Sequence, residues 1–417
     1  MIRLDKICTW TLIVCLAGMI WSGSLVKWLD ELACYTLLVV GLLDCVVNRR
    51  WRAYRPLLLA LAIMAAYVAY SCFRPYNTLP YIVMDAIIEL KPFVPLMVVL
   101  AIRPQLSATE RIILKGVALV NTVAVLVLYA LPVFREYTLD MHIMYLGASC
   151  MVDAMVWVYC SLDDDGRVSN RDMAVAIILL AIGLGCTRAK YYGEVIVALY
   201  FLLVYRPGMA RGVKPAHWLL GLTVVAAVVV AGWSKFSYYF LTGDSGSLDP
   251  MVAESFARPV LYATGGLILV SEFPLGSGLA SFASYASQAH YSQLYHEYGI
   301  SKIYGLSEEF GDFICDAFYP SLAQFGVVGV ALFVWFLVWA FRPLKRLVRL
   351  SPSTFRYHYA LGAIIICFIL IESVASTMVM QSWGLLVMLL LGFIGSAQVS
   401  AQLSVDIDNT QLSKLMS

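Results

Sequence analysis

The sequence predicts an all-α integral membrane protein with about 12 transmembrane helices, and three observations support this prediction. Of the 417 residues, 61% are hydrophobic and only 13% are charged, which is about half the charged fraction of an ordinary soluble domain. The mean hydropathy is +0.80. The apolar residues also occur in runs close to the roughly 20 residues that cross a bilayer. A soluble fold of this size would lack the polar surface that it needs.

Apolar runs define the predicted spans, and short polar segments separate most of them. The runs are 7–23, 30–47, 56–72, 81–102, 112–131, 142–160, 173–186, 190–205, 217–233, 319–341, 359–377 and 382–397. One long polar segment, 234–318, interrupts the series. We therefore expect helices one to nine within 1–233, a large loop with short helices at 234–318, and helices ten to twelve within 319–417.

The distribution of lysine and arginine predicts the orientation. With a cytoplasmic N-terminus, 20 of the 29 Lys and Arg residues fall in cytoplasmic segments and eight on the opposite side, while Lys91 lies within a span. Cytoplasmic loops carry such an excess of positive charge. Both termini are thus predicted to be cytoplasmic and segment 234–318 to lie outside. The net charge of +2 gives no indication of a nucleic-acid partner.

The junction of the seventh and eighth spans has almost no loop and contains two cations. It reads Thr187-Arg188-Ala-Lys190. The eighth span begins here, so its free N–H groups and the positive end of its dipole lie beside both cations. This arrangement predicts an anion site suited to a phosphate or diphosphate. The alternative is that the two cations only reach for the membrane surface.

The long loop contains a second candidate cation and a row of acids. Arg258 begins a short apolar helix that ends near Pro274, and it either binds a second phosphate or forms an ion pair with a loop acid. Glu308, Asp312 and Asp316 are spaced by four, which predicts one face of a helix. Carboxylates there can deprotonate a hydroxyl group, although a solvated acidic surface is the alternative.

Lys91 is the unusual charge within a span. Ionisable groups inside a membrane are either paired or functional, and Asp85 and Glu89 lie close enough in sequence to neutralise Lys91.

The ten cysteines occur singly, without a Cys-x-x-Cys pair. The sequence therefore predicts neither a metal site nor a cofactor.

Aromatic and imidazole side chains complete the candidates on the outer side. The loop and its boundary contain nine tyrosines, including Tyr319, whose faces suit stacking on a sugar, although membrane interfaces also enrich Tyr. The histidines predicted to lie outside, and hence to be candidate bases, are His142, His290 and His296.

The order of these features resembles the O-antigen ligase/O-antigen polymerase superfamily. Thr187-Arg188 matches the "S/T-R" turn of the family. Arg258 followed by Pro274-Leu-Gly-Ser-Gly-Leu-Ala-Ser-Phe282 matches its "R…PLxGxGxxxF" stretch. Phe318 to Gly329 is similar to the stretch that leads into a long span in the family. The resemblance covers residues 180–340 well, and the remainder in hydropathy and number of spans.

This resemblance implies glycan transfer on the periplasmic face of a bacterial inner membrane, from an undecaprenyl-diphosphate-linked oligosaccharide and without a metal. Arg188 and Arg258 would bind the diphosphate and neutralise the leaving group. The substrate-binding residues expected beside them are Lys190, Asp312, Lys91 and Tyr319. Partners would be the lipid-linked glycan, a flippase and a chain-length regulator.

One departure from the family pattern bears on the reaction. Ligases of the family have a histidine as presumed base where this chain has Cys315 and Asp316. This favours a polymerase that extends an O-antigen, capsule or exopolysaccharide, with Asp316 as the base or as a group that orients the acceptor. The alternatives are a ligase acting on lipid A-core or a protein hydroxyl, a non-enzymatic lipid or solute transporter, and a structural or sensory membrane protein.

Overall fold

The computed structural model describes residues 4–21, 28–139, 141–207, 223, 230 and 257–397. Within these residues every regular element is a helix and no strand occurs, so the predicted all-α class is confirmed for the described part of the chain. The predicted span 217–233, except residues 223 and 230, lies outside the described residues, as does the first part of the predicted loop, 234–256.

A helix occupies each predicted span that the structure describes. In chain order the α-helices are α1 (Leu4–Gly18), α2 (Leu29–Val47), α3 (Trp51–Ser71), α4 (Leu79–Leu90), α5 (Phe93–Ile102), α6 (Ala108–Ala130), α7 (Met144–Cys160), α8 (Asn170–Gly183), α9 (Ala189–Leu199), α12 (Ala257–Ser271), α13 (Tyr285–Ala289), α14 (Leu294–Glu297), α15 (Phe318–Ser321), α16 (Gly326–Leu350), α17 (Arg356–Glu372) and α18 (Ser382–Gly395).

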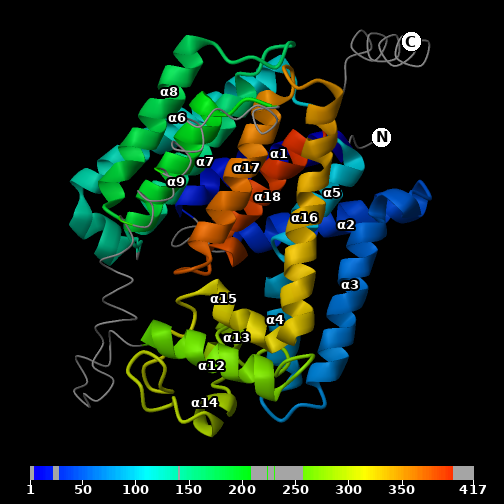
Figure 1. The fold of residues 1–417 in the computed structure, drawn as a ribbon, viewed down its shortest axis with the longest axis vertical. Helices are drawn as coiled ribbons and strands as arrows, with labels where there is room; N and C mark the ends of the chain where they lie inside the picture. Colours follow the sequence, from blue (N-terminus) through cyan, green and yellow to red (C-terminus); the bar gives the residue numbers. More distant parts are fainter. Residues whose placement is uncertain are drawn as a thin grey trace.

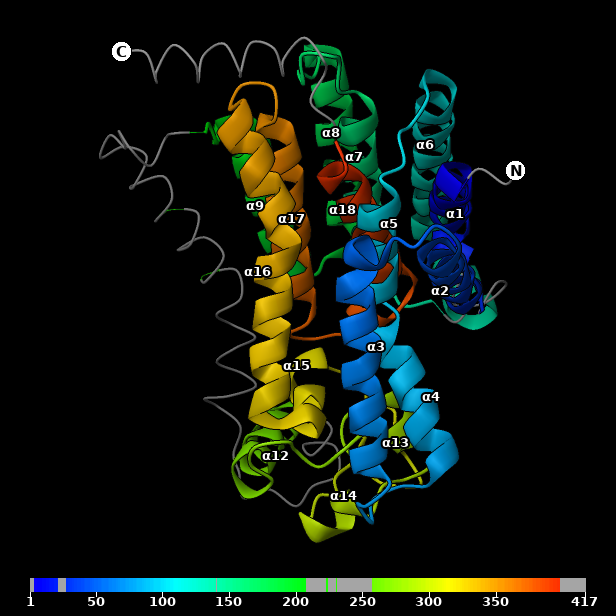
Figure 2. The ribbon, with the colours of Figure 1, turned by 90° about the vertical axis from the view of Figure 1, so that its right-hand side faces the viewer.

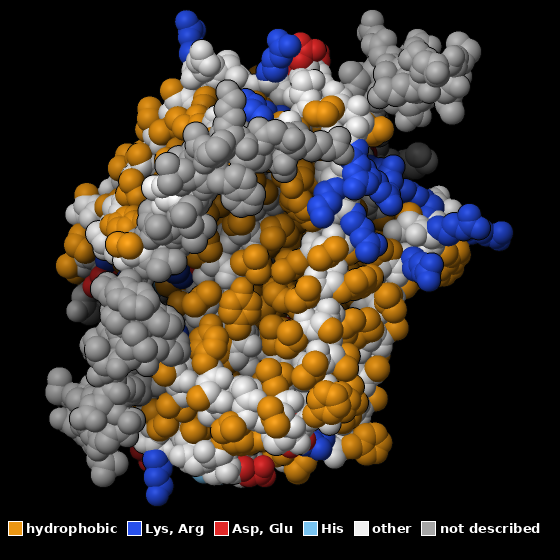
Figure 3. All heavy atoms as spheres, viewed as in Figure 1, with side chains coloured by type: hydrophobic (Ala, Val, Ile, Leu, Met, Phe, Trp, Pro, Cys, Tyr) orange, Lys and Arg blue, Asp and Glu red, His pale blue; other side chains and the backbone are white. Residues whose placement is uncertain are grey.

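Several of these helices have the length and composition of membrane spans. Four long apolar segments qualify within the described residues: Leu4–Trp21, Trp51–Ser71, Ala108–Ala130 and Phe318–Leu350. Figure 3 shows hydrophobic side chains over the broad face of the molecule, and Lys and Arg gathered toward its upper end. These features are those of a membrane-embedded protein.

The helices form two regions that follow one another along the long axis of the molecule. In Figure 1 a bundle that includes α6 to α9, α17 and α18 occupies the upper part, and the short helices α12 to α15 lie below it. Helices α3 and α16 run down toward this lower region, as Figure 2 shows from the side. Helix α18 lies inside the bundle, because almost all of its side chains are buried.

The predicted span 81–102 is two helices, which corrects the expectation of one. Helix α4 ends at Leu90 and α5 begins at Phe93, with Lys91 and Pro92 between them. Proline has no N–H to donate and its ring clashes with the preceding turn, so the helix breaks there. The break lets the Lys91 side chain reach α2.

The predicted span 319–341 also begins differently. The chain forms α15 and a 3₁₀ turn, and α16 starts only at Gly326, whose φ is +63°. A Cβ on Gly326 would lie 2.3 Å from the Pro274 carbonyl oxygen, so glycine is needed. The Gly278 N–H donates to the Gln324 carbonyl at 2.9 Å, and the Val328 N–H donates to Pro274 at 3.2 Å. The two glycine-containing motifs of the sequence therefore pack against each other.

The predicted helix through Glu308, Asp312 and Asp316 is absent, and the segment forms consecutive turns instead. Gly305 has a φ of +81°, and its carbonyl accepts a hydrogen bond from the Phe313 N–H at 2.9 Å. This contact folds the segment back on itself, so a spacing of four does not align the acids. Glu308 and Asp312 are exposed, and Asp316 alone is directed toward a partner.

Candidate functional site

Arg188 lies at the start of α9, as the sequence predicted. Thr187 adopts the left-handed conformation and Arg188 is the residue before the first helical position, so the chain turns without a loop. A guanidinium nitrogen of Arg188 lies 2.8 Å from Nε2 of His142, which precedes α7. Arg188 thus lies at the N-terminus of α9, where an anion is favoured, and its guanidinium contacts the segment before α7.

Lys190, two residues later, is paired with an acid from the far end of the chain. Its ammonium group lies 2.5 Å from the carboxylate of Glu372, the last residue of α17. Glu194, one turn further along α9, is also buried, and its carboxylate interacts with Glu372. Lys190 therefore joins α9 to α17 through Glu372, and the Glu194 carboxyl group lies beside this ion pair.

Arg258 and Asp316 form an ion pair between α12 and the segment before α15. Arg258 is the second described residue of α12, the helix that the apolar run after it predicts. The sequence offered phosphate binding or an ion pair with a loop acid, and in the structure Arg258 makes the ion pair. Both side chains keep part of their surface exposed, at 22% and 30% respectively, so an anion can still reach the guanidinium.

Hydrogen bonds attach this ion pair to the helix that carries Glu372. The Tyr262 hydroxyl donates to the Val374 carbonyl, and the Tyr319 hydroxyl donates to Leu370, both at 2.8 Å. The Phe318 N–H donates to the Ser373 carbonyl at 3.1 Å. Tyr319 thus has a positioning contact in this structure, and its ring remains partly exposed.

The positive charges of Arg258 and Lys190 both act on Asp316. Burial raises the pKa of the Asp316 carboxyl above its usual value, while these two cations oppose the increase. The carboxylate therefore binds a proton more readily than an exposed aspartate does. We call Arg188, Lys190 and Arg258, with their partners His142, Glu372 and Asp316, the cationic cluster.

Lys91 belongs to a different place, a polar chamber of about 550 Å³. Its ammonium group binds Asp30 at 2.8 Å and Glu31 at 2.5 Å, both at the start of α2. The neighbours expected from the sequence, Asp85 and Glu89, line the same chamber without forming the ion pair.

The chamber lies next to the cationic cluster. Cys315 and Phe318 line the chamber, whereas Asp316, between them in sequence, pairs with Arg258. The single short segment 315–318 thus separates the two. Trp383, at the start of α18, forms another part of the chamber wall.

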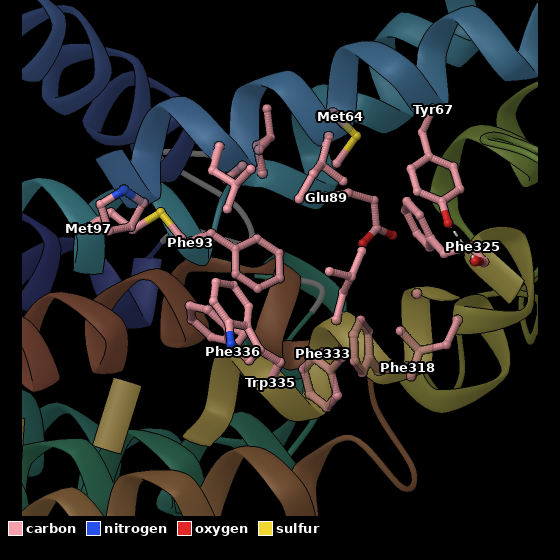
Figure 4. A pocket seen from close by; sticks show the side chains of 18 residues that line it. Met64, Tyr67, Glu89, Phe93, Met97, Phe318, Phe325, Phe333, Trp335 and Phe336 are labelled. Atoms are coloured by element: carbon pink, nitrogen blue, oxygen red, sulfur yellow. Dashed lines mark hydrogen bonds between the residues drawn. The ribbon is translucent and has the colours of Figure 1, made fainter. Parts of the chain in front are cut away.

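An apolar pocket lies between α3 and α16, and Glu89 connects it to the chamber. Figure 4 shows Met64, Phe93, Phe333 and Phe336 around this pocket, with the Glu89 carboxylate directed into it. Glu89 and Phe318 line both hollows. The hydrocarbon-lined pocket and the polar chamber are therefore separated by only two side chains.

The structure does not bring every predicted residue to one site. Asp312 is exposed on the surface. His290 and His296 are exposed and contact the rings of Tyr81 and Tyr291. Of the three candidate histidines, only His142 contacts the cationic cluster.

Sequence reasoning missed Glu372, Glu194, Asp30 and Glu31. A signal for the first two was available, because each is an acid within an otherwise apolar run, at 359–377 and 190–205. Ionisable residues in such runs need a partner. No local signal joins Lys91 to Asp30, because 61 positions separate them.

Comparisons with known proteins add no identification. No protein-family model matches the chain, and no curated protein matches it. The functional argument therefore depends on the residues of the site.

Proposed function

We propose that this chain is a membrane glycan polymerase that transfers an undecaprenyl-diphosphate-linked oligosaccharide onto another lipid-linked repeat unit at the periplasmic face. One observation carries the proposal: Arg258 of α12 forms an ion pair with Asp316, and Lys190 of α9 lies near enough to act electrostatically on the same carboxylate. A polyprenyl diphosphate needs several cations, and an attacking hydroxyl needs one base.

In the proposed complex, Arg188 and Arg258 bind the diphosphate, with Lys190 adding charge. Guanidinium groups suit phosphate oxygens because they donate two parallel hydrogen bonds. The first N–H groups of α9 add further donors beside Arg188. As the glycosidic bond breaks, negative charge grows on the diphosphate, and these groups stabilise it.

Diphosphate binding would also activate Asp316. In this structure the Asp316 carboxylate accepts a hydrogen bond from Arg258. When the diphosphate takes over that guanidinium, Asp316 loses its ion-pair partner, and its basicity increases. The base is thus released when the donor arrives.

The reaction is one displacement. The acceptor hydroxyl oxygen bonds to the anomeric carbon, and its proton passes to Asp316. The bond from that carbon to the diphosphate oxygen breaks, and its electron pair leaves on the lipid diphosphate. The anomeric configuration is inverted, and neither a metal nor a nucleotide takes part.

A gel of surface polysaccharide from a deletion strain tests this proposal. The strain is complemented with the wild type, Arg188→Ala, Arg258→Ala or the control Lys302→Ala, which removes an exposed cation of the same region. We expect single repeat units on the acceptor in the deletion strain and both arginine variants, and a full ladder with Lys302→Ala at equal protein levels.

The same gel separates the alternatives. Loss of every repeat unit from the acceptor would indicate a ligase that acts on lipid A-core or a protein hydroxyl. An unchanged ladder in both arginine variants would contradict glycan transfer by this site.

Transport of a lipid or solute is the second candidate function. The observation in its favour is the interior chamber, because Lys91, Asp30 and Asp85 are buried there and transport sites need charges within the bundle. A reconstituted transporter would move labelled lipid diphosphate across vesicles, whereas the polymerase would not.

A further inference from the structure

The polar chamber has more acid than base. Four carboxylates, those of Asp30, Glu31, Asp85 and Glu89, line it together with one ammonium group, that of Lys91. Lys91 pairs with the first two. The carboxylates of Asp85 and Glu89, on one face of α4, remain without a cation among the described residues.

Glu89 lacks the hydrogen bonds that burial normally requires, whereas Asp85 has donors from the protein itself. Glu89 is 5% exposed and makes no hydrogen bond or ion pair among the described residues. Asp85 is fully buried. Its Oδ2 accepts from the Ala280 N–H at 2.7 Å, and the side chains of Ser284 and Gln324 lie against the carboxylate as further donors. A buried acceptor without a donor is costly, which indicates that a ligand supplies donors here.

Aromatic side chains frame the same space. Trp383 is held in place, because its ring stacks on Tyr145 at 4.5 Å and its indole N–H donates to Ser149 at 3.0 Å. Tyr285 and Phe318 form other parts of the wall. Fixed aromatic faces beside a few acceptors suit a molecule that has both C–H faces and hydroxyl or amino donors.

We propose that the chamber binds a saccharide whose polar groups are hydroxyl and amino donors, and that it excludes glycans bearing carboxylate or phosphate at this position. Asp85 and Glu89 accept hydrogen bonds from the sugar, Glu89 from the boundary between the chamber and the apolar pocket, and the aromatic faces contact its ring. A volume of about 550 Å³ is sufficient for a small ligand. A carboxylate or phosphate would meet the like charge of the chamber carboxylates.

This inference rests on the proposed function, because it assigns the chamber to the glycan and the cationic cluster to the diphosphate. The two neighbouring sites have opposite charge preferences. Segment 315–318 lies between them, so a glycan in the chamber is close to Asp316.

Binding of three disaccharides to the purified full-length protein in detergent tests the inference. The probes are cellobiose, the glucosamine disaccharide with protonated amines, and digalacturonate, each titrated calorimetrically. We expect the glucosamine disaccharide to bind at least about tenfold more tightly than digalacturonate, with cellobiose between them.

Conservative variants connect the preference to the two acids. Glu89→Gln and Asp85→Asn should reduce the preference for the glucosamine disaccharide over digalacturonate to less than about threefold. The asparagine oxygen can still accept the hydrogen bond from the Ala280 N–H. The control Glu309→Gln removes an exposed acid and should keep the preference. Tyr285→Ala should weaken all three probes alike, and it is tolerated because this side chain is 58% exposed.

Equal or tighter binding of digalacturonate would overturn the inference, as would a preference that both acid variants retain. Absence of binding for all three probes up to about 10 mM would do the same. Arg188→Ala and Arg258→Ala should bind the probes normally. If the two arginine variants bind the probes and also give an unchanged polysaccharide ladder, the proposed saccharide site in the chamber stands and the polymerase proposal fails.

Discussion

The cationic cluster and the polar chamber are neighbours that differ in whether their charged groups have partners of opposite charge. In the cluster each cation has a partner from a distant element, as with Lys190 and Glu372 or Arg258 and Asp316. In the chamber Asp85 and Glu89 exceed the available cations. Compensated charge holds helices together and can be released by a competing ion, whereas uncompensated charge costs stability and indicates a ligand.

The largest expected effect concerns the acid of the cluster. Asp316→Asn should reduce polymer formation by about 10²- to 10⁴-fold, because an amide cannot accept the proton. In wild type the active form is the carboxylate. Since burial raises the pKa of Asp316, activity should decrease on acidification at a higher pH than an ordinary aspartate, near about 4, would give.

The measurement is polymer formation by membranes as a function of pH. Asp316→Glu provides the matched control, because it keeps a base and should retain an acidic limb at a shifted pH. Full activity of Asp316→Asn would remove the role proposed for this residue.

The second expected effect tests compensation in the cluster. Lys190→Met leaves Glu372 and Glu194 buried without their cation, and should lower the free energy of unfolding by about 3 kcal/mol. The double variant Lys190→Met/Glu372→Gln should recover most of this loss, because it removes the uncompensated charge as well. Unfolding in detergent by denaturant measures both. If the double variant is as unstable as the single one, the charge pairing is not the cause.

The smallest expected effect is an increase in the free energy of unfolding, opposite in direction to the effect of Lys190→Met. Glu89→Gln removes a carboxylate that has no partner, and should raise the free energy of unfolding by about 1 kcal/mol while weakening function. The same unfolding experiment measures it, with Glu309→Gln as a control that should change little. A clear loss of stability in Glu89→Gln would show that the chamber acid is compensated after all.

Local sequence patterns predicted the helices and part of the site. The apolar runs correspond to helices in the described residues, and the Thr187-Arg188 turn begins α9 as expected. Arg258 lies in α12, the helix that the apolar run after it predicts. These predictions succeeded because each depends on neighbours in the sequence.

The parts that failed depend on distant contacts or on the backbone. The partners of Lys91 lie on another helix, at Asp30 and Glu31. The acids at 308–316 have helical spacing, but Gly305 and Phe313 fold that segment into turns. The late start of α16 at Gly326 depends on its contact with Pro274. Such pairings are decided by packing, which spacing alone does not encode.

The short central helix α18 has a consequence for the electric field across the protein. Its 14 residues extend over about 21 Å, less than the roughly 30 Å hydrocarbon core of a bilayer. Trp383 and its neighbours at its first turn line the chamber, so water that enters the chamber shortens the insulating path. A membrane voltage then falls over a smaller thickness at the centre of the bundle, between the chamber and the opposite face.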